Sequence, residues 1–417
     1  MSYLFTKDER PTMENFNNKL RGAVENAVET ADFKVGDTLA TVRTDLGDNW
    51  LLANGEAASV ADYPDLMKLG FERGAVKSIS NGYNAQLHDI ACYNGTWVAV
   101  GWSWPDGTSI NPYITATTDP TGEWISQEVS ATSIKLNGIA CYNGTWVAVG
   151  NTNATSPSPY IYTTTDPTGE WTENNIGTTS CFLTDIACYN GTWVAVGYTP
   201  SGYPRVWTTT DPTGEWTKID VSGSTVSYLA CVTCYNGTWV TVGRDANNTT
   251  VYIWTSDDPT GTWTQKAAIS DNFVPTDIIC HKGKWVMVGY YGSQGSWAYS
   301  SDDITTWSKS SALTLSGETA TISGITCIDN TYMAVGHQNS VFYPFITTTT
   351  DPLGTWTSQQ LSTDRVYVHG VAHSDNTWVV AGHSYSGTKP SIGTNLLFYL
   401  PTITIDNAYT YIKAKED

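Results

Sequence analysis

The chain has 417 residues, enough for two or three domains or for one large repeat array with a smaller part. Charged residues make up only 15% of it, while 18 Trp and 24 Tyr favour short strands and tight turns over helices. A formal net charge of -19 disfavours nucleic acids and anionic membrane surfaces as partners.

The N-terminal region, residues 1–32, lacks the basic and apolar stretches of a signal peptide, and no apolar run in the chain reaches about 18 residues. We therefore expect synthesis in the cytosol without a cleavable export signal, and no membrane insertion. After a proline, residues 11–31 carry an apolar residue at every fourth position, at Phe16, Leu20, Val24 and Val28. This spacing predicts a short amphipathic helix, suited to packing against copies of itself.

Two segments far apart in the chain carry a second pattern. Residues 33–70 contain Trp50-Leu-Leu-Ala-Asn-Gly and later Tyr63-Pro-Asp-Leu, and residues 396–417 contain Leu397-Phe-Tyr-Leu-Pro401. These elements resemble the collar-type segment of bacteriophage tail and tail-fibre proteins, in which Gly-Trp-x-x-x-(Asn/Asp)-Gly leads to Tyr-Pro-x-Leu and then to Phe-x-Leu-Pro. The resemblance implies a small collar-type domain that a large insertion divides into residues 33–70 and 396–417.

The insertion, residues 71–395, is a sevenfold repeat. A marker aromatic recurs every 46 to 49 residues, at Trp97, Trp146, Trp193, Trp239, Trp285, Tyr332 and Trp378. A period in the forties with about four strand signals per unit is typical of a β-propeller. We therefore predict an all-β chain, with a seven-bladed β-propeller inserted in a small collar-type domain and a short N-terminal helix.

Two turn motifs recur in the units. Asn-Gly, as at Asn94-Gly95, predicts a type I′ hairpin, because both central residues of that turn need positive φ. Asp-Pro-Thr-Gly-Glu-Trp, as at Asp166–Trp171, predicts a type I turn and resembles the Asp-box of sialidase-like propellers, which is a fold element in that family. We expect its Trp to enter the core between blades. We expect its Asp to accept hydrogen bonds from turn N–H groups at Asp119, Asp166, Asp211, Asp258, Asp302 and Asp351.

The seventh unit lacks the Asp-box-like turn, so its fourth strand has to come from elsewhere. Residues 72–80 stand in the fourth-strand position just ahead of the first complete unit. We predict that they complete the last blade and close the ring, which would remove exposed sheet edges. The alternative source of this strand is Leu396–Leu400.

Six cysteines stand five residues before a marker aromatic, at Cys92, Cys141, Cys188, Cys234, Cys280 and Cys327. Since His373 takes the same position in the seventh unit, a ring of soft metal ligands is conceivable. Small residues near a crowded axis explain the pattern better. We predict no metal and no cofactor.

The loops after the second strand differ in every unit, whereas the two turn motifs on the opposite face are nearly identical in four or more units. Loops on a rigid scaffold are the usual place for recognition, and aromatics among small polar residues suit sugars or flat protein epitopes. Drift of unconstrained loops is the alternative explanation. The candidate ligand-binding residues are Trp102, Trp104, Tyr198, Tyr203, Arg244, Tyr290, Tyr291, His337, Phe342, Tyr343, His383 and Tyr385.

A sialidase-like glycoside hydrolase would need clustered arginines for the substrate carboxylate and paired carboxylates for the chemistry. The repeats offer only Arg73, Arg205, Arg244 and Arg365, which do not match the arrangement of that family. We therefore predict that the chain is not an enzyme and has no catalytic residues.

These features lead to the prediction of a phage tail-fibre or receptor-binding protein, made in the host cytoplasm and carried in the virion. Its propeller would bind a glycan or protein receptor on the host surface, with a glycan favoured. Its N-terminal region would attach to other tail or baseplate proteins, and the resemblance to tail fibres implies a homotrimer. The first alternative is a structural tail or decoration protein without a receptor, and the less favoured one is the hydrolase.

Overall fold

A computed structural model describes residues 38–41, 50–52, 57–59, 73–79, 84–129, 133–176, 180–221, 226–247, 249–292, 295–315, 317–328, 330–374, 377–387, 389–399 and 409–413. These residues form strands, turns and bends, with no helix among them. In particular, no apolar helix of membrane-spanning length occurs in the described part of the chain. The chain divides into two compact units, Met1–Arg73 with Phe398–Asp417, and Gly74–Leu397.

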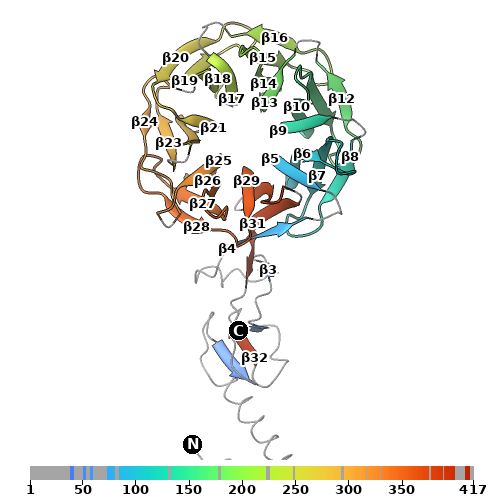
Figure 1. The fold of residues 1–417 in the computed structure, drawn as a ribbon, viewed down its shortest axis with the longest axis vertical. Coiled ribbons are helices and arrows are strands. Elements are labelled where there is room, and N and C mark those ends of the chain that lie inside the picture. The colour runs from blue at the N-terminus through green and yellow to red at the C-terminus, as the bar shows by residue number, and fades with distance from the viewer. Residues whose placement is uncertain are drawn as a thin grey trace, which may run out of the picture. The chain divides into compact units, whose positions relative to one another are not determined.

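The larger unit is a seven-bladed β-propeller, as predicted, and Figure 1 shows its blades arranged in a ring. Each blade is an antiparallel sheet whose first strand lies nearest the centre (Figure 1). The first strands are β5 (Ala85–Tyr93), β9 (Ile134–Tyr142), β13 (Phe182–Tyr189), β17 (Val226–Tyr235), β21 (Val274–His281), β25 (Ala320–Ile328) and β29 (Val366–Ser374). The second strands are β6 (Thr96–Ser103), β10 (Thr145–Thr152), β14 (Thr192–Tyr198), β18 (Thr238–Asp245), β22 (Lys284–Tyr291), β26 (Thr331–Gln338) and β30 (Thr377–Ser384).

The outer two strands complete each blade. The third strands are β7 (Asn111–Thr117), β11 (Pro159–Thr164), β15 (Pro204–Thr209), β19 (Val251–Ser256), β23 (Gly295–Ser301), β27 (Pro344–Thr349) and β31 (Pro390–Tyr399). The fourth strands of the first six blades are β8 (Ile125–Glu128), β12 (Thr172–Asn175), β16 (Thr217–Asp220), β20 (Thr264–Ile269), β24 (Ser308–Lys309) and β28 (Thr357–Gln360).

The seventh blade takes its outer strand from the start of the array. β4 (Arg73–Ser78) pairs with β31, and the backbone N–H of Ile79 donates to the carbonyl of Pro390 at 3.0 Å. Ile79 is buried in the core between blades seven and one. The prediction that residues 72–80 close the ring is therefore confirmed, while Leu396 to Tyr399 continue the third strand.

The smaller unit contains a three-stranded sheet built from both ends of the chain. β32 (Tyr409–Lys413) lies between β1 (Thr38–Thr41) and β2 (Trp50–Leu52), and β3 (Ala57–Ser59) belongs to the same unit. The segments before and after the propeller thus pair with each other. The predicted helix over residues 11–31 and most of the predicted collar-type segments lie outside the described residues, so the helix and the collar-type domain stay predictions.

The hairpin between the first two strands of a blade has the predicted backbone. In blade one, Asn94 and Gly95 have φ of 47° and 74°, the positive values that a type I′ turn requires. The Asn-Gly pairs of blades two to four and Lys282-Gly283 of blade five share this conformation.

The Asp-box-like turn is held by its aspartate. Asp119 Oδ1 accepts hydrogen bonds from the Thr121 N–H at 2.9 Å and from the Thr121 hydroxyl at 2.7 Å, and Trp124 Nε1 donates to the Pro120 carbonyl. Equivalent aspartate bonds form in the turns at Asp166, Asp211, Asp258 and Asp351. The prediction was wrong in blade five, where Asp303 takes the place expected for Asp302. Its Oδ1 accepts from the N–H groups of Thr305 and Thr306 in a turn without Pro or Gly.

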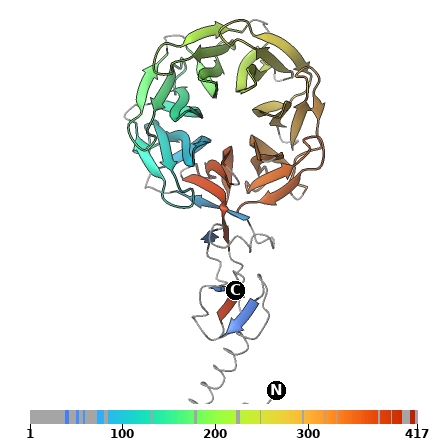
Figure 2. The same ribbon diagram turned by 180° about the vertical axis from the view of Figure 1, so that it is seen from behind.

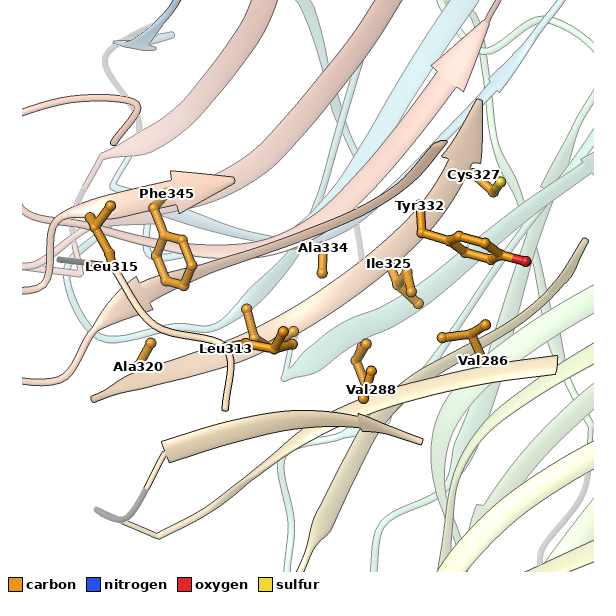
Figure 3. Packing of buried hydrophobic residues seen from close by; sticks show 12 residues of the cluster. Val286, Val288, Leu313, Leu315, Ala320, Ile325, Cys327, Tyr332, Ala334 and Phe345 are labelled. Atoms are coloured by element: carbon orange, nitrogen blue, oxygen red, sulfur yellow. The ribbon is translucent and has the colours of Figure 1, made fainter. Parts of the chain in front are cut away.

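The cores lie between neighbouring blades. Between blades five and six, Val286 and Val288 of β22 pack with Ile325, Tyr332 and Phe345 of the next blade, as Figure 3 shows. The Trp of the Asp-box-like turn is buried in this way in blades one to four and is half-buried in blades five and six. A fully buried apolar side chain of this size contributes roughly 1.5–3 kcal/mol, so the repeated interfaces hold the ring together.

A β-bulge interrupts the first strand of every blade. In blade one, Leu87 pairs with Gly101 and Asp89 with Val100, which leaves His88 without a partner in the ladder. The register shifts at the equivalent place in the other six blades. The bulge brings the strands so close that a Cβ on Gly101 would lie 1.9 Å from the Gln86 carbonyl oxygen. This contact explains the glycine that all seven units share, at Gly101, Gly150, Gly197, Gly243, Gly289, Gly336 and Gly382.

Three half-buried aspartates next to the bulges tie blades together in pairs. Asp277 Oδ1 accepts from the N–H of Ile278 at 2.7 Å, and its Oδ2 accepts from the N–H of Ile325 in the next blade at 2.8 Å. Asp89 and Asp185 make the same pair of bonds from blades one and three. Burial raises the pKa of Asp185 to about 6. Burial, with the nearby Asp185, raises the pKa of Asp277 to about 7.

The raised pKa of Asp277 predicts a pH-dependent contribution to stability. Its folded pKa lies above the unfolded value of about 3.9, so the protonated carboxyl stabilises the fold at low pH, and this stability is lost as pH rises to about 7. In Asp277→Asn, the stability advantage of the wild type should therefore grow as pH falls from about 7 to about 4, by up to ~1.4 kcal/mol per pH unit. Denaturant unfolding at both ends of that window measures it, with the exposed Asp364→Asn as control. Parallel pH curves for wild type and Asp277→Asn would contradict the assignment.

Candidate functional site

The ring has two unlike faces, which Figures 1 and 2 view from opposite sides. Because consecutive strands of a blade are antiparallel, the loops from second to third strand and from fourth to the next first strand share one face, here called the loop face. The Asn-Gly hairpins and the Asp-box-like turns share the other, the turn face. The sequence differences between blades therefore gather on the loop face, together with the beginnings of the first strands.

Aromatic rings from blades six and seven meet on the loop face. The ring of Phe342 lies 4.6 Å from that of Tyr385 and 5.3 Å from that of Tyr367, measured between centroids. His337 lies edge-on to Tyr367 at 4.7 Å. Phe342 reaches this position with φ of 62°, and its carbonyl accepts a hydrogen bond from the Val366 N–H. The loop after β26 is thus fixed against the start of β29.

The cluster continues from blade seven into blade one. Tyr367 lies 5.3 Å from His383, which stacks on His369 at 4.9 Å. His369 stacks on His88 at 4.6 Å, and His88 stacks on Trp102 at 3.9 Å. With Trp104 beside Trp102, these rings form one connected set, here called the aromatic arc: Phe342, Tyr385, Tyr367, His337, His383, His369, His88, Trp102 and Trp104.

A pocket of about 440 Å³ adjoins the arc at His88. It is lined by His88, Lys135, Asn137, Asn151, Thr152, Asn153, Ala154, Phe182, Leu183, Thr184 and Tyr198. One wall is aromatic, because Phe182 and Tyr198 stack at 5.0 Å and Tyr228 lies 5.6 Å beyond Tyr198. The pocket spans blades one to three on the loop face, so no single blade forms it.

The polar groups of the pocket are held in place. Asn137 Nδ2 donates to the Leu183 carbonyl at 2.6 Å and to Asn151 Oδ1 at 3.1 Å. Lys135 is the only charged side chain in the pocket lining, which contains no carboxylate. Its Nζ lies 4.7 Å from the Trp102 ring centroid. Burial, then His383 and Lys135, lowers the pKa of His88 to about 3, so this imidazole is neutral. A ligand would therefore meet amides, hydroxyls, rings and one cation.

Seven of the twelve predicted site residues belong to these features. Trp102, Trp104, His337, Phe342, His383 and Tyr385 are in the arc, and Tyr198 lines the pocket. Arg244 lies beside them, 5.4 Å from the Tyr228 ring.

Four predicted residues lie elsewhere or contribute differently. Tyr203 is 59% exposed and lies under Arg205, and the Tyr291 hydroxyl accepts a hydrogen bond from Asn272. The Tyr343 carbonyl accepts from the Gln338 N–H. Tyr290 lies close enough to Tyr228 to add to the rise of the Tyr228 pKa to about 12, which burial mainly causes.

Sequence reasoning missed the site residues on the first strands. His88, Lys135, Phe182, Tyr367 and His369 all come from the beginning of such a strand, near or at its bulge. The signal was present in the repeat: the bulge position reads His88, Asn137, Thr184, Ala230, Thr276, Ser323 and His369, while the glycine opposite it is invariant. The bulge residue differs between blades, while the glycine on the neighbouring strand stays the same. The fold therefore leaves the bulge residue free to take a different role in each blade.

The repeated cysteines lie near the ends of the first strands, toward the turn face. Cys92 and Cys327 pack at blade interfaces, and Cys280 and Cys327 line a second pocket of about 470 Å³ with His281 and His373. None of the eight cysteines, all of them described, forms a disulfide. Burial raises the pKa of Cys280 to about 12, so its sulfur is held as a thiol. His373 Nδ1 is hydrogen-bonded to the Thr326 hydroxyl at 2.6 Å.

The arginines considered for a hydrolase are spread over different blades. Each of these arginines lies over a tyrosine ring, Arg205 over Tyr203, Arg244 over Tyr228 and Arg365 over Tyr385, and Arg205 also pairs with Asp220 at 3.3 Å. The side chain of Arg73 lies outside the described residues.

No protein-family model matches this chain, and no curated protein matches it. Solved structures share its fold. YCF48 bound to a D1 peptide is similar with a TM-score of 0.56 and 13% identity, over 78% of this chain and 95% of YCF48. Trypanosoma rangeli sialidase in complex with sialic acid is similar with a TM-score of 0.47 and 12% identity, over 82% of this chain and 59% of the sialidase.

The likeness to YCF48 shows the fold, and the comparisons correct one prediction. The chain is a β-propeller whose structural neighbours bind ligands, a peptide in one case and sialic acid in the other. The prediction that the chain is not an enzyme was wrong as a general exclusion, because neighbours of this fold include sialidases, which are enzymes. At 10 to 13% identity these likenesses give no activity to this chain.

Proposed function

We propose that this chain is the receptor-binding protein of a phage tail, and that the loop face of its propeller binds a glycan on the host surface. One observation carries the proposal: the pocket and the aromatic arc share His88 and so form a continuous binding surface across blades six, seven, one, two and three.

The chemistry of this surface favours a sugar. Ring faces such as Phe182 and Tyr198 suit the C–H patches of a pyranose, while the amides of Asn137 and Asn151 suit its hydroxyls. A volume of about 440 Å³ is in the usual range for a small-molecule site. Since Lys135 is the only charged lining residue, a sugar with a carboxylate or phosphate is favoured over a cationic one.

The assignment to a phage tail is supported by the ends of the chain. The segment that resembles the collar-type pattern includes β2, and β2 and β1 both pair with β32 from the C-terminal end. Such pairing supports the proposal that the propeller is inserted in an attachment domain. In this proposal the N-terminal region binds other tail or baseplate proteins, the assembly is a trimer, and the protein resides in the virion.

The proposal predicts a loss of binding when the pocket wall is truncated. In Tyr198→Ala the aromatic wall loses its central ring, and affinity for the glycan should fall about tenfold, which corresponds to ~1.4 kcal/mol. Lys135→Ala should produce a similar fall for an anionic sugar and a smaller one for a neutral sugar. Binding of the labelled full chain to a panel of purified bacterial surface glycans, and to intact bacteria, measures both.

Leu353→Ala is the matched control, because Leu353 is an apolar side chain, 41% exposed, on the turn face. Its binding should equal that of the wild type. Equal binding by wild type and Tyr198→Ala would place the ligand elsewhere on the chain. A wild-type chain that labels no host cell and no glycan would favour the alternative of a structural tail protein without a receptor.

A further inference from the structure

Three histidines of the aromatic arc lie side by side on the loop face of the propeller. His88 comes from β5, His369 from β29 and His383 from β30, so two blades contribute. One ring nitrogen of each lies within 4.8 Å of the corresponding nitrogens of the other two. His88 and His369 occupy the same repeat position, the bulged residue of the first strand.

Each of the three side chains has one ring nitrogen without a hydrogen-bond partner within the described residues. Nε2 of His88, Nε2 of His369 and Nδ1 of His383 are buried atoms without a hydrogen bond. Buried polar atoms are normally satisfied, and the three unsatisfied nitrogens lie on neighbouring stacked rings, where a ligand could pair with them. Hydrogen bonding within the protein therefore leaves this trio open to an external group.

The spacing of the rings fits coordination of one metal ion. Their centroids are 4.6, 4.9 and 6.1 Å apart. Imidazoles bound to a tetrahedral metal at Zn–N distances of about 2.0–2.1 Å have centroids about 5 Å apart. The ring planes are now nearly parallel, at 16° to 28°. Binding therefore needs the side chains to rotate so that the three nitrogens converge on one point, while the distances between ring centroids change by only about 1 Å or less.

We propose that His88, His369 and His383 bind a divalent transition-metal ion, with Zn²⁺ as the best match. Imidazole suits Zn²⁺, Cu²⁺ and Ni²⁺, and three histidines leave a fourth position open for water or a ligand oxygen. His88 also lines the pocket, so the proposed metal site adjoins that pocket on the loop face.

The protonation state supports this site. Burial, with the neighbouring histidines, lowers the pKa of His369 far below 6.5, and it lowers the pKa of His383 to about 4. Neutral imidazole is the form that binds metal, so no proton has to be displaced at neutral pH.

Metal binding by the full chain tests the proposal. After treatment with a chelator, the chain should take up one equivalent of Zn²⁺ at neutral pH in equilibrium dialysis. His369→Ala and His383→Ala should each weaken this binding more than about 100-fold, because loss of a ligand costs more than loss of an outer-shell partner. His281→Ala is the control, since His281 lies on the turn face with Asn330, and it should bind as the wild type does.

Co²⁺ provides a readout in the unmodified chain if a variant fails to fold. The wild type should give the intense visible absorption of a four-coordinate nitrogen and oxygen site, without the near-ultraviolet band of a cobalt thiolate. A thiolate band would assign the metal to the cysteines and overturn the proposal. So would stoichiometric binding that survives in both histidine variants, or no binding by the wild type.

Discussion

Deletion of β4, residues Arg73–Ser78, should open the propeller and lower its free energy of unfolding by more than about 4 kcal/mol. β31 would lose its outer partner and expose a long edge, which invites pairing with another chain. The bonds of Ser78 and Ile79 to the Pro390 carbonyl would also be lost or displaced. Thermal melting by circular dichroism and size-exclusion chromatography should show a lower transition and larger species.

Removal of residues 1–32, which leaves β4 in place, is the control for shortening the chain. Its propeller transition should match that of the full chain. If the β4 deletion melts at the wild-type temperature and elutes as the wild type does, ring closure by this strand contributes nothing measurable, and the seventh blade is stable with three strands.

Gly101→Ala should lower the free energy of unfolding by at least about 3 kcal/mol. The new methyl group would lie 1.9 Å from the Gln86 carbonyl oxygen and within 3.0 Å of Leu87 Cα, so the bulge and the strand beside it must separate. Because both neighbours are backbone, no side-chain rotation can relieve the contact. Denaturant unfolding of the full chain measures the loss.

Gly261→Ala is the matched control. A Cβ there would lie 3.4 Å from its nearest neighbour, which is ordinary van der Waals contact, and the change should cost under about 1 kcal/mol. Equal stabilities of the two variants would show that the bulge relaxes freely, and the shared glycine would then need another explanation.

The fold was predictable because its determinants are local and repeated. Asn94-Gly95 specifies a hairpin by backbone conformation alone, and Asp119 closes its turn through bonds to Thr121, two residues away. Even the closing strand was predictable. The seventh unit lacks a fourth-strand segment, and one extra strand segment precedes the first unit. Asp303 was missed because without proline and glycine the turn is formed by a different aspartate than the repeat suggests.

The site was predictable only in part, because it depends on how blades meet. Trp102 near the end of β6 and Phe342 in the loop after β26 were visible as differences between repeats. The stacking of His88 on His369 depends on ring closure, which places blade seven beside blade one. It also depends on a bulge that frees these two residues from the ladder, and no local motif encodes either fact.

Hydrogen–deuterium exchange of the full chain with and without a bound surface glycan tests the binding role of the loop face most directly. Glycan binding there should slow exchange of the backbone around Lys135–Asn137, Asn151–Ala154 and Phe182–Thr184, with no change at the Asn-Gly hairpins of the turn face. Protection confined to the turn face, or to residues outside the propeller, would contradict the assignment of the loop face as the binding surface.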